Sequence, residues 1–170
     1  MLPTTVVIRA AASYGGRMTS THAPFLVDPL VSTQWLADHL GSESLIVLDA
    51  SVVELPPLDD GPVRLVSGYD LYLFDGHVPG AVFVELLDTG RGLGASSAEE
   101  VRRGAAAIGV TEQHTLVLYD QLDGRSAERL RAALTGAGYE RVALLDGGLG
   151  RWRSEARELR FGRPDGSFGA

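Results

Sequence analysis

Three apolar runs in the sequence end in an aspartate, and carboxylates at such positions can do chemistry. They are Asp49 in "SLIVLDAS", Asp120 in "HTLVLYD" and Asp146 in "RVALLDGG". If the runs are parallel strands, their carboxyl ends meet at one edge of the sheet, where three carboxylates could hold Mg²⁺ for phosphoryl chemistry. The alternative is structural, because an aspartate after a strand accepts hydrogen bonds from the backbone of the next turn. We favour the structural alternative, since the phosphatase Asp-x-Asp signature is missing and the chain has no lysine.

Histidine and serine offer weaker candidates. His77 lies in "GHVPGA" (76–81), where we expect its ring to bond to the backbone of a turn. The other histidines are scattered without metal-ligand spacing: His22, His39 and His114. Ser126 has no histidine and acid near it in the sequence, and "GRGLGASS" (90–97) lacks the lysine of a phosphate loop and is predicted to be a flexible loop. We therefore predict no metal and no cofactor.

Composition narrows the function classes further. The net charge of −7 argues against a nucleic-acid surface. No run approaches the roughly 20 apolar residues of a membrane span, so we expect a cytoplasmic protein. All 15 basic residues are arginine, which we interpret as the codon bias of a bacterium. The absence of cysteine excludes disulfides, thiolate metal sites and any cysteine nucleophile.

The elements that must position these residues alternate between helix and strand. Ser32 is a predicted N-cap, and Ser97 with Glu100 has capping-box spacing. Helices are predicted within 31–41, 96–110, 124–139 and the end of 141–159. Strands are predicted within 44–51, 81–84, 114–120 and the start of 141–159, with a short strand at 63–66 and a loop at 54–62. This alternation predicts an α/β fold with a parallel sheet covered by helices on both faces.

Four of these stretches, in this order, resemble the rhodanese-like domain. They are "LVSTQWLADHLGSESLIVLDAS" (30–51), "GHVPGA" (76–81), the strand, loop and helix at 116–130, and "YERVALLDGGLGRW" (139–152). The chain looks most similar to the first domain of the two-domain thiosulfate and 3-mercaptopyruvate sulfurtransferases. The resemblance implies a three-layer fold with a mostly parallel central sheet over residues 26–158. The second stretch supplies the family-motif residues, Gly76, His77, Pro79 and Gly80.

In catalytic members of that family, a six-residue loop after the strand begins with a cysteine, carries sulfur as a persulfide, and typically ends with arginine. The six residues here are Asp120, Gln121, Leu122, Asp123, Gly124 and Arg125. Arg125 matches the closing arginine, but a carboxylate in place of the thiolate cannot carry a persulfide. Asp123 adds a second negative charge to a loop that otherwise favours an anion. We expect Asp120 to turn inward, accept the loop N–H groups and pair with Arg125.

The resemblance also divides the chain. We expect residues 1–25 to be a disordered leader, with Met18 as an alternative start, and residues 159–170 to be a flexible tail that begins an interdomain linker. The chain would then be either a truncated relative of a two-domain enzyme or a stand-alone module. Arginines near this end are expected to form a solvated helix face, with a docking surface for an acidic partner as the alternative: Arg151, Arg153, Arg157, Arg160 and Arg163.

Two function classes therefore remain open. The first is a non-catalytic rhodanese-like module that supports or binds another protein. The second is a part of a sulfurtransferase that is active only with a cysteine-bearing domain or chain as its partner. The magnesium-dependent phosphoryl enzyme that would use Asp49, Asp120 and Asp146 is a remote third.

Overall fold

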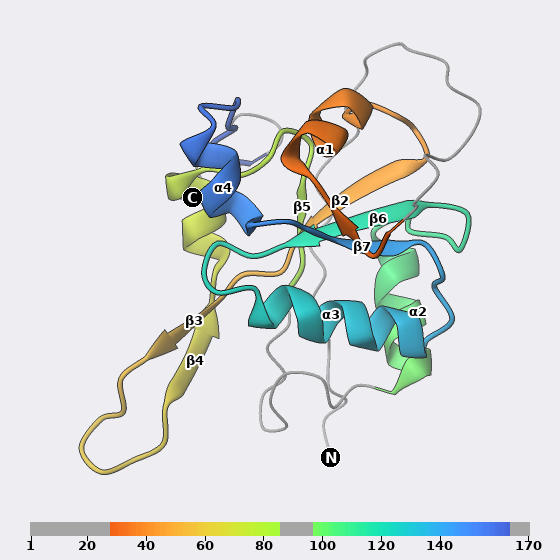
Figure 1. The fold of residues 1–170 in the computed structure, drawn as a ribbon. Helices are drawn as coiled ribbons and strands as arrows, with labels where there is room; N and C mark the ends of the chain where they lie inside the picture. The colour runs from red at the N-terminus through yellow and green to blue at the C-terminus, as the bar shows by residue number, and fades with distance from the viewer. Residues whose placement is uncertain (1–27, 86–96, 164–170) are drawn as a thin grey trace.

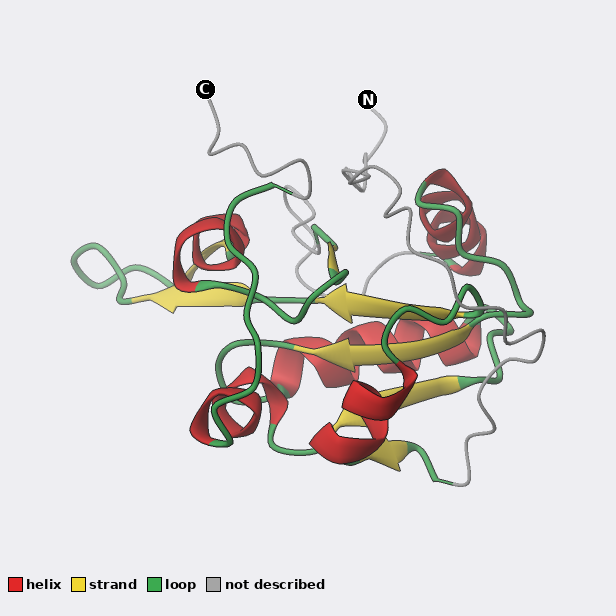
Figure 2. Cartoon of the chain, turned by 90° about the horizontal axis from the view of Figure 1, so that it is seen from above, coloured by secondary structure: helices red, strands yellow, loops and turns green. Residues whose placement is uncertain are grey.

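Five short strands form a parallel sheet at the centre of the molecule (Figure 1). The computed structural model describes residues 28–85 and 97–163. The strand order is β1 (Leu30–Val31), β7 (Val142–Leu145), β6 (Thr115–Tyr119), β2 (Leu45–Asp49) and β5 (Val82–Phe83), and each neighbouring pair is parallel. The central strand β6 is buried along its whole length, which explains why its sequence is apolar without alternation. The view from above shows these strands side by side (Figure 2).

Helices cover both faces of the sheet and enclose two hydrophobic clusters. On one face, α1 (Thr33–His39), α4 (Gly148–Ser154) and a π-helical turn, η1 (Leu71–Asp75), pack against Val47 and Val117. On the other face, α2 (Ala98–Ala107) and α3 (Arg125–Gly136) pack against side chains such as Leu48. Since neighbouring strand residues point to opposite faces, one strand serves both clusters. The predicted three-layer α/β fold is confirmed.

Two of the predicted helix starts have the predicted caps. The hydroxyl of Ser32 accepts the N–H of Trp35 at 3.0 Å, which starts α1. At α2, Ser97 accepts the N–H of Glu100, and the Glu100 carboxylate accepts the N–H of Ser97 at 2.7 Å. Each cap satisfies N–H groups that have no partner inside the helix, so the helix boundaries follow from local sequence.

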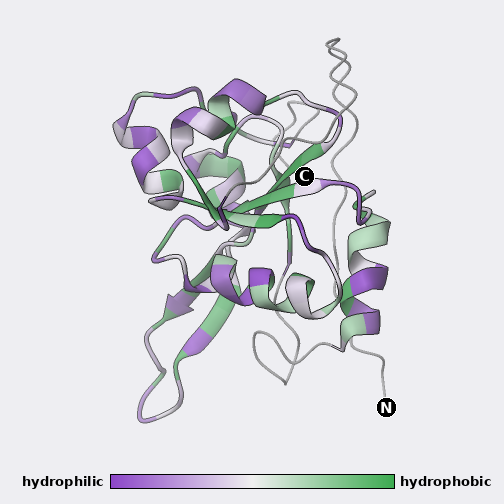
Figure 3. Ribbon diagram, turned by 45° about the vertical axis from the view of Figure 1, so that its right-hand side comes forward, coloured by the Kyte–Doolittle hydropathy of each residue, from purple (hydrophilic) through white to green (hydrophobic). Residues whose placement is uncertain are grey.

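A hairpin of two antiparallel strands, β3 (Val52–Leu55) and β4 (Arg64–Ser67), projects from the body of the domain (Figure 1). The loop predicted at 54–62 is therefore wrong in its first two residues, because Glu54 and Leu55 pair with Leu65 and Arg64. Hydrophobic residues concentrate in the central strands, whereas the outer faces of the helices are largely hydrophilic (Figure 3).

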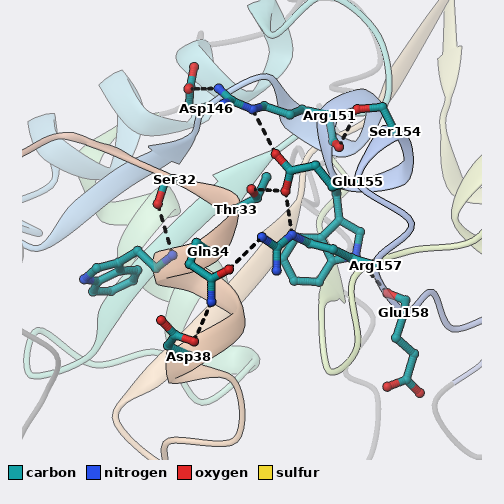
Figure 4. A network of polar contacts seen from close by, with 12 residues as sticks. Ser32, Thr33, Gln34, Asp38, Asp146, Arg151, Ser154, Glu155, Arg157 and Glu158 are labelled. Atoms are coloured by element: carbon teal, nitrogen blue, oxygen red, sulfur yellow. Dashed lines mark hydrogen bonds and ion pairs between the residues drawn. The ribbon is translucent and has the colours of Figure 1, made fainter.

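Polar side chains join α1 to α4 (Figure 4). Thr33 donates its hydroxyl to Glu155, which also accepts from Arg151 at 3.2 Å and from Arg157 at 2.6 Å. Arg157 in turn donates to the side chain of Gln34 at 3.1 Å. Of the arginines expected on a solvated face, Arg157 thus links the end of α4 to α1, and Arg151 orients the Glu155 carboxylate.

The chain after α4 runs back across the domain. Arg160 and His77 exchange backbone hydrogen bonds of 2.8 and 2.9 Å, and the N–H of Gly162 donates to the carbonyl of Leu73 at 2.7 Å. Residues 160–162 of the expected tail are therefore hydrogen-bonded to the domain. Residues 1–27, 86–96 and 164–170, which include the expected leader and most of the predicted loop at 90–97, lie outside the described residues. Within the described ranges, no helix is long and apolar enough to cross a membrane.

Candidate functional site

The loop that begins at Asp120 lies between the central strand β6 and helix α3. Gly124 adopts a φ of 84°, a conformation that favours glycine, and this turn lets the chain enter α3 directly. The loop therefore wraps around the point where the N–H groups at the start of α3 converge. Such a point favours a negative charge.

The carboxylate of Asp120 occupies that point. One oxygen accepts the N–H groups of Leu122 and Gly124, both at 2.9 Å, and the other accepts the N–H of Ala127 at 3.1 Å. The residue is 3% exposed. The prediction that Asp120 turns inward and takes the loop N–H groups is confirmed.

Arg125 does not pair with Asp120, so that part of the prediction is wrong. Its Nε lies 2.9 Å from the carboxylate of Asp123, and its Nη1 lies 3.9 Å from the carboxylate of Glu54 on the hairpin. Asp123 also accepts the backbone N–H of Arg125 at 3.2 Å. Since backbone donors already surround the buried Asp120, the guanidinium remains on the surface and pairs with the second loop carboxylate.

A second carboxylate, that of Asp49 at the end of β2, lies fully buried behind the loop. It accepts the N–H and hydroxyl of Ser51, the side-chain amide of Gln121 at 3.2 Å and the hydroxyl of Tyr119. Ser51 in turn accepts the backbone N–H of Gln121 at 3.0 Å. Burial raises the pKa of the Asp49 carboxyl above its ordinary value, against the lowering effect of these hydrogen bonds.

Sequence reasoning predicted that Asp49 would bond to its following turn, but missed Tyr119 and the link to Gln121. The sequence contained part of the information needed to predict these two contacts. Gln121 directly follows a strand-ending aspartate, and Ser51 follows the other by two residues. Polar residues at the carboxyl ends of two strands meet when those strands are neighbours, and β2 and β6 are neighbours only through the sheet topology.

The turn at 76–80 forms the third side of the site. Gly76 has a φ of 94°, and its carbonyl accepts the side-chain amide of Gln121 at 3.1 Å. The N–H of Val78 donates to the hydroxyl of Tyr119 at 3.2 Å, which fixes the turn to β6. After Pro79, Gly80 adopts a φ of 76° and the chain enters β5.

His77 has the role expected of it within that turn. Its Nδ1 bonds to the carbonyl of Tyr72 at 2.9 Å, and its ring stacks on the Tyr72 ring at 3.7 Å. Burial lowers the pKa of the His77 imidazole below its ordinary value. The residue is 3% exposed, so its ring lies buried within the turn.

The three strand-ending aspartates do not form a metal site. Asp49 and Asp120 have the separate partners described above, and Asp146 forms an ion pair with Arg151. Within residues 28–85 and 97–163, no three histidine, aspartate or glutamate side chains group in a way that could hold a metal ion. The magnesium-dependent phosphoryl alternative therefore has no ligand set in the described part of the chain.

The site as a whole combines a loop that contains no cysteine with two exposed apolar side chains, Leu122 and Phe161, here called the apolar rim. Leu122, at the tip of the loop, is 56% exposed. Phe161 is 48% exposed, and its ring packs so closely on Gly76 that a Cβ added there would lie 2.9 Å from it. Because Gln121 bonds to Gly76, these two apolar side chains flank the same contact between loop and turn.

Known proteins are similar to this chain over a region that includes the loop at Asp120 and the turn at 76–80. A family model described as a rhodanese-like domain matches residues 32–155. Thiosulfate/3-mercaptopyruvate sulfurtransferase 2 of Arabidopsis thaliana is 30% identical over 161 residues, which cover 89% of this chain and 44% of the relative. A putative thiosulfate sulfurtransferase, SseB, of Mycobacterium tuberculosis is 37% identical over 115 residues, which cover 61% of this chain and 39% of the relative.

A solved structure agrees with these relatives. The crystal structure of the 3-mercaptopyruvate sulfurtransferase SseA from Escherichia coli superposes with a TM-score of 0.64 at 30% identity, and covers 83% of this chain and 56% of that chain. The chain thus spans about half, or less, of the length of the curated relatives it matches.

Proposed function

The chain belongs to the rhodanese-like domain family, and from this premise we propose that it is a non-catalytic module that binds a cysteine-bearing sulfurtransferase domain. The main observation behind this proposal is the set of hydrogen bonds that Asp120 accepts. Its carboxylate takes the backbone donors of Leu122, Gly124 and Ala127, the groups that would otherwise stabilise a thiolate. The chain has no cysteine that could replace it.

The step that the loop lacks is the attack of a thiolate on the sulfur donor. In transfer from thiosulfate, a thiolate attacks the outer sulfur, the sulfur–sulfur bond of thiosulfate breaks, and sulfite leaves with the electron pair. A carboxylate oxygen lacks the soft nucleophilicity of a thiolate and forms no stable adduct with that sulfur. The loop at Asp120 therefore holds its own anion and has no group to which sulfur could be transferred.

The apolar rim supports a binding role. Leu122 and Phe161 are large side chains that remain about half exposed beside the loop. Exposed apolar patches mark interaction surfaces more often than scattered apolar residues do, and each of these two side chains adjoins the contact between Gln121 and Gly76. The occupant proposed for this rim is a rhodanese domain with a cysteine.

A second candidate function follows from the greater length of the relatives. In it, the same surface binds a cysteine-bearing domain that belongs to the same enzyme. The chain covers 44% of the Arabidopsis thiosulfate/3-mercaptopyruvate sulfurtransferase and 39% of the mycobacterial relative. In this case the chain contributes to sulfur transfer only when a cysteine-bearing domain is supplied. The two candidates differ in whether the complex has a higher rate than the cysteine-bearing domain alone.

The first experiment compares thiosulfate-to-cyanide sulfur transfer by the natural chain, Asp120→Cys and Asp123→Cys. Asp123→Cys is the matched control, because it places a thiol in the same loop without the three backbone donors. We expect no enzymatic rate from the natural chain. After exposure to thiosulfate, Asp120→Cys should gain the mass of one sulfur atom and Asp123→Cys should not. Turnover by the natural chain would refute the non-catalytic assignment.

The second experiment tests binding. The purified chain is mixed with the isolated cysteine-bearing domain of the Escherichia coli 3-mercaptopyruvate sulfurtransferase, and complex formation is followed by sedimentation. Leu122→Asp should weaken the complex, whereas Leu58→Asp, at the still more exposed tip of the hairpin, should not. No complex at any concentration tested, or equal effects of the two substitutions, would contradict the proposed surface.

A further inference from the structure

The carboxylate of Asp49 connects all three segments of the site. It lies at the end of β2, and it accepts from Tyr119 at the end of β6 and from Gln121 in the loop. Gln121 also donates to the carbonyl of Gly76 in the turn. Tyr119 also accepts the N–H of Val78 in that turn. A single buried group thus lies beneath the loop and the turn together.

Every hydrogen-bonding partner that the structure gives this carboxylate is a donor. The donors are the N–H and hydroxyl of Ser51, the side-chain amide of Gln121 and the hydroxyl of Tyr119. A proton taken up by Asp49 would turn one acceptor oxygen into a donor. At least one of these contacts must then break or reverse.

Both Ser51 donors occupy Oδ1 of Asp49, whereas the Gln121 amide donates to Oδ2, so a proton carried on Oδ2 faces an amide nitrogen that cannot accept it. The Gln121 amide nitrogen donates to Asp49 at 3.2 Å and to the Gly76 carbonyl at 3.1 Å. If the amide turned over to accept from a protonated Asp49, its oxygen would face the carbonyl oxygen of Gly76. Two acceptors without a shared proton repel each other, so the amide has one orientation that satisfies both partners.

We infer that Asp49 is a proton-operated latch: its carboxylate holds Gln121 and the loop against the turn at Gly76, and uptake of a proton releases them. Ser51 adds to the hold, because its hydroxyl accepts the backbone N–H of Gln121 while it donates to Asp49. The buried position of Asp49 places the release at a higher pH than for an ordinary aspartate.

The other titratable groups near Asp49 do not supply this switch. Tyr119 from β6 contacts it, and Tyr72 from the π-helical turn interacts with it through charge, but burial raises the pKa of both phenols above the ordinary value. His77 stacks on Tyr72 and bonds to its carbonyl, and burial lowers the pKa of its imidazole. Asp120 directs its carboxylate into the loop rather than toward Asp49.

The side-chain amide of Gln121 can be observed directly by NMR, because the sequence contains few such groups. The chain has no asparagine and only three glutamines, Gln34, Gln113 and Gln121, so its spectrum contains three side-chain amide pairs. In ¹H–¹⁵N spectra recorded from about pH 8 to about pH 4, we expect the Gln121 pair to titrate with a midpoint above about 3.9, the ordinary aspartate value. The backbone amide of Gln121 should lose protection from exchange over the same range. The Gln34 and Gln113 pairs serve as internal references.

Asp49→Asn is the decisive variant, since it fixes a neutral group of the same shape. Its Gln121 signals should match those of the acidified natural chain at every pH. A static Gln121 pair in the natural chain, or titration that persists in Asp49→Asn, would overturn the inference. If Asp49→Asn fails to fold, Gln121→Met removes the latch and leaves Asp49 in place. The loop amides of that variant at neutral pH should then match those of the acidified natural chain, and retention of the natural pattern would equally overturn it.

The latch is a property of the chain alone, and only its effect on partner binding rests on the proposed function. If the loop titrates but no cysteine-bearing domain binds at any pH, the proposed partner is wrong and the latch remains. If the partner binds equally at all pH values and the Gln121 pair is static, the latch is wrong and the partner remains.

Discussion

Thr33 at the start of α1 donates its hydroxyl to the carboxylate of Glu155 at the end of α4, across 122 positions of the chain (Figure 4). The same carboxylate accepts from Arg151 and Arg157. Glu155 therefore connects the two helices that cover one face of the sheet. The segment that follows α4 then pairs with the turn at 76–80, so Glu155 anchors the helix from which that segment leaves.

The first prediction concerns the pH dependence of stability. The hydrogen bond from Thr33, followed by that from Arg157, lowers the pKa of Glu155 from 4.5 to about 2. Because the pKa is lower in the folded state, the stabilisation is complete above 4.5 and is lost as the pH falls toward 2. Glu155→Gln should lower the urea midpoint at neutral pH, and its difference from the natural chain should shrink on acidification. Glu99→Gln, which removes an exposed pair with Arg103, is the control and should have little effect.

The second prediction concerns the buried carboxylate of the loop. Asp120→Ala leaves the N–H groups of Leu122, Gly124 and Ala127 without their acceptor, and one or more lost buried hydrogen bonds cost about 1–3 kcal/mol each. Urea unfolding should show a loss of that order, with faster amide exchange at these three residues. Asp123→Ala, which removes a half-exposed side chain of the same loop, should change stability by about 0.5 kcal/mol or less. Equal losses in both variants would contradict the role given to Asp120.

Local signals in the sequence account for most of the elements around the site. Ser32, Ser97 and the apolar run before Asp120 predict helix starts and a buried strand correctly, because caps and burial on both faces depend on residues close in sequence. The inward position of Asp120 also follows from local geometry, since its three donors lie within seven residues.

Features that depend on tertiary pairing were not predictable in this way. The strand at Val52–Leu55 carries Glu54 and precedes two prolines, and it exists because it pairs with Arg64–Ser67 across a long loop. The two residues of β1 are a strand only because β7 lies beside them. Arg125 pairs with Asp123 and not with Asp120, because backbone N–H groups already surround the Asp120 carboxylate. The link from Asp49 to Gln121 spans 72 positions and required the strand order of the sheet.

The third prediction separates backbone strain from crowding in the turn. Gly76 and Gly80 both have positive φ values, 94° and 76°, so alanine is strained at either position. A Cβ at Gly76 would also lie 2.9 Å from the ring of Phe161, whereas a Cβ at Gly80 would meet nothing within 4 Å. Gly80→Ala should cost about 1–2 kcal/mol, and Gly76→Ala should cost more and displace Phe161. Gly76→Ala combined with Phe161→Ala should recover part of the difference, as measured by urea unfolding. No recovery would mean that strain alone accounts for the loss.

The fourth prediction tests the hydrogen bond between Tyr119 and Asp49. Tyr119→Phe removes a donor that lowers the pKa of Asp49, and it leaves the N–H of Val78 without its acceptor. The pKa of Asp49 should therefore rise further, and the midpoint of the Gln121 side-chain titration should move to higher pH. Tyr72→Phe is the matched control, because the Tyr72 hydroxyl donates to the carbonyl of Ala81 at 2.8 Å rather than to Asp49. Both variants lose one buried hydroxyl, so a shift of the midpoint in Tyr119→Phe alone would assign the effect to the contact with Asp49. Equal shifts in the two variants would instead assign it to a general loosening of the core around the turn.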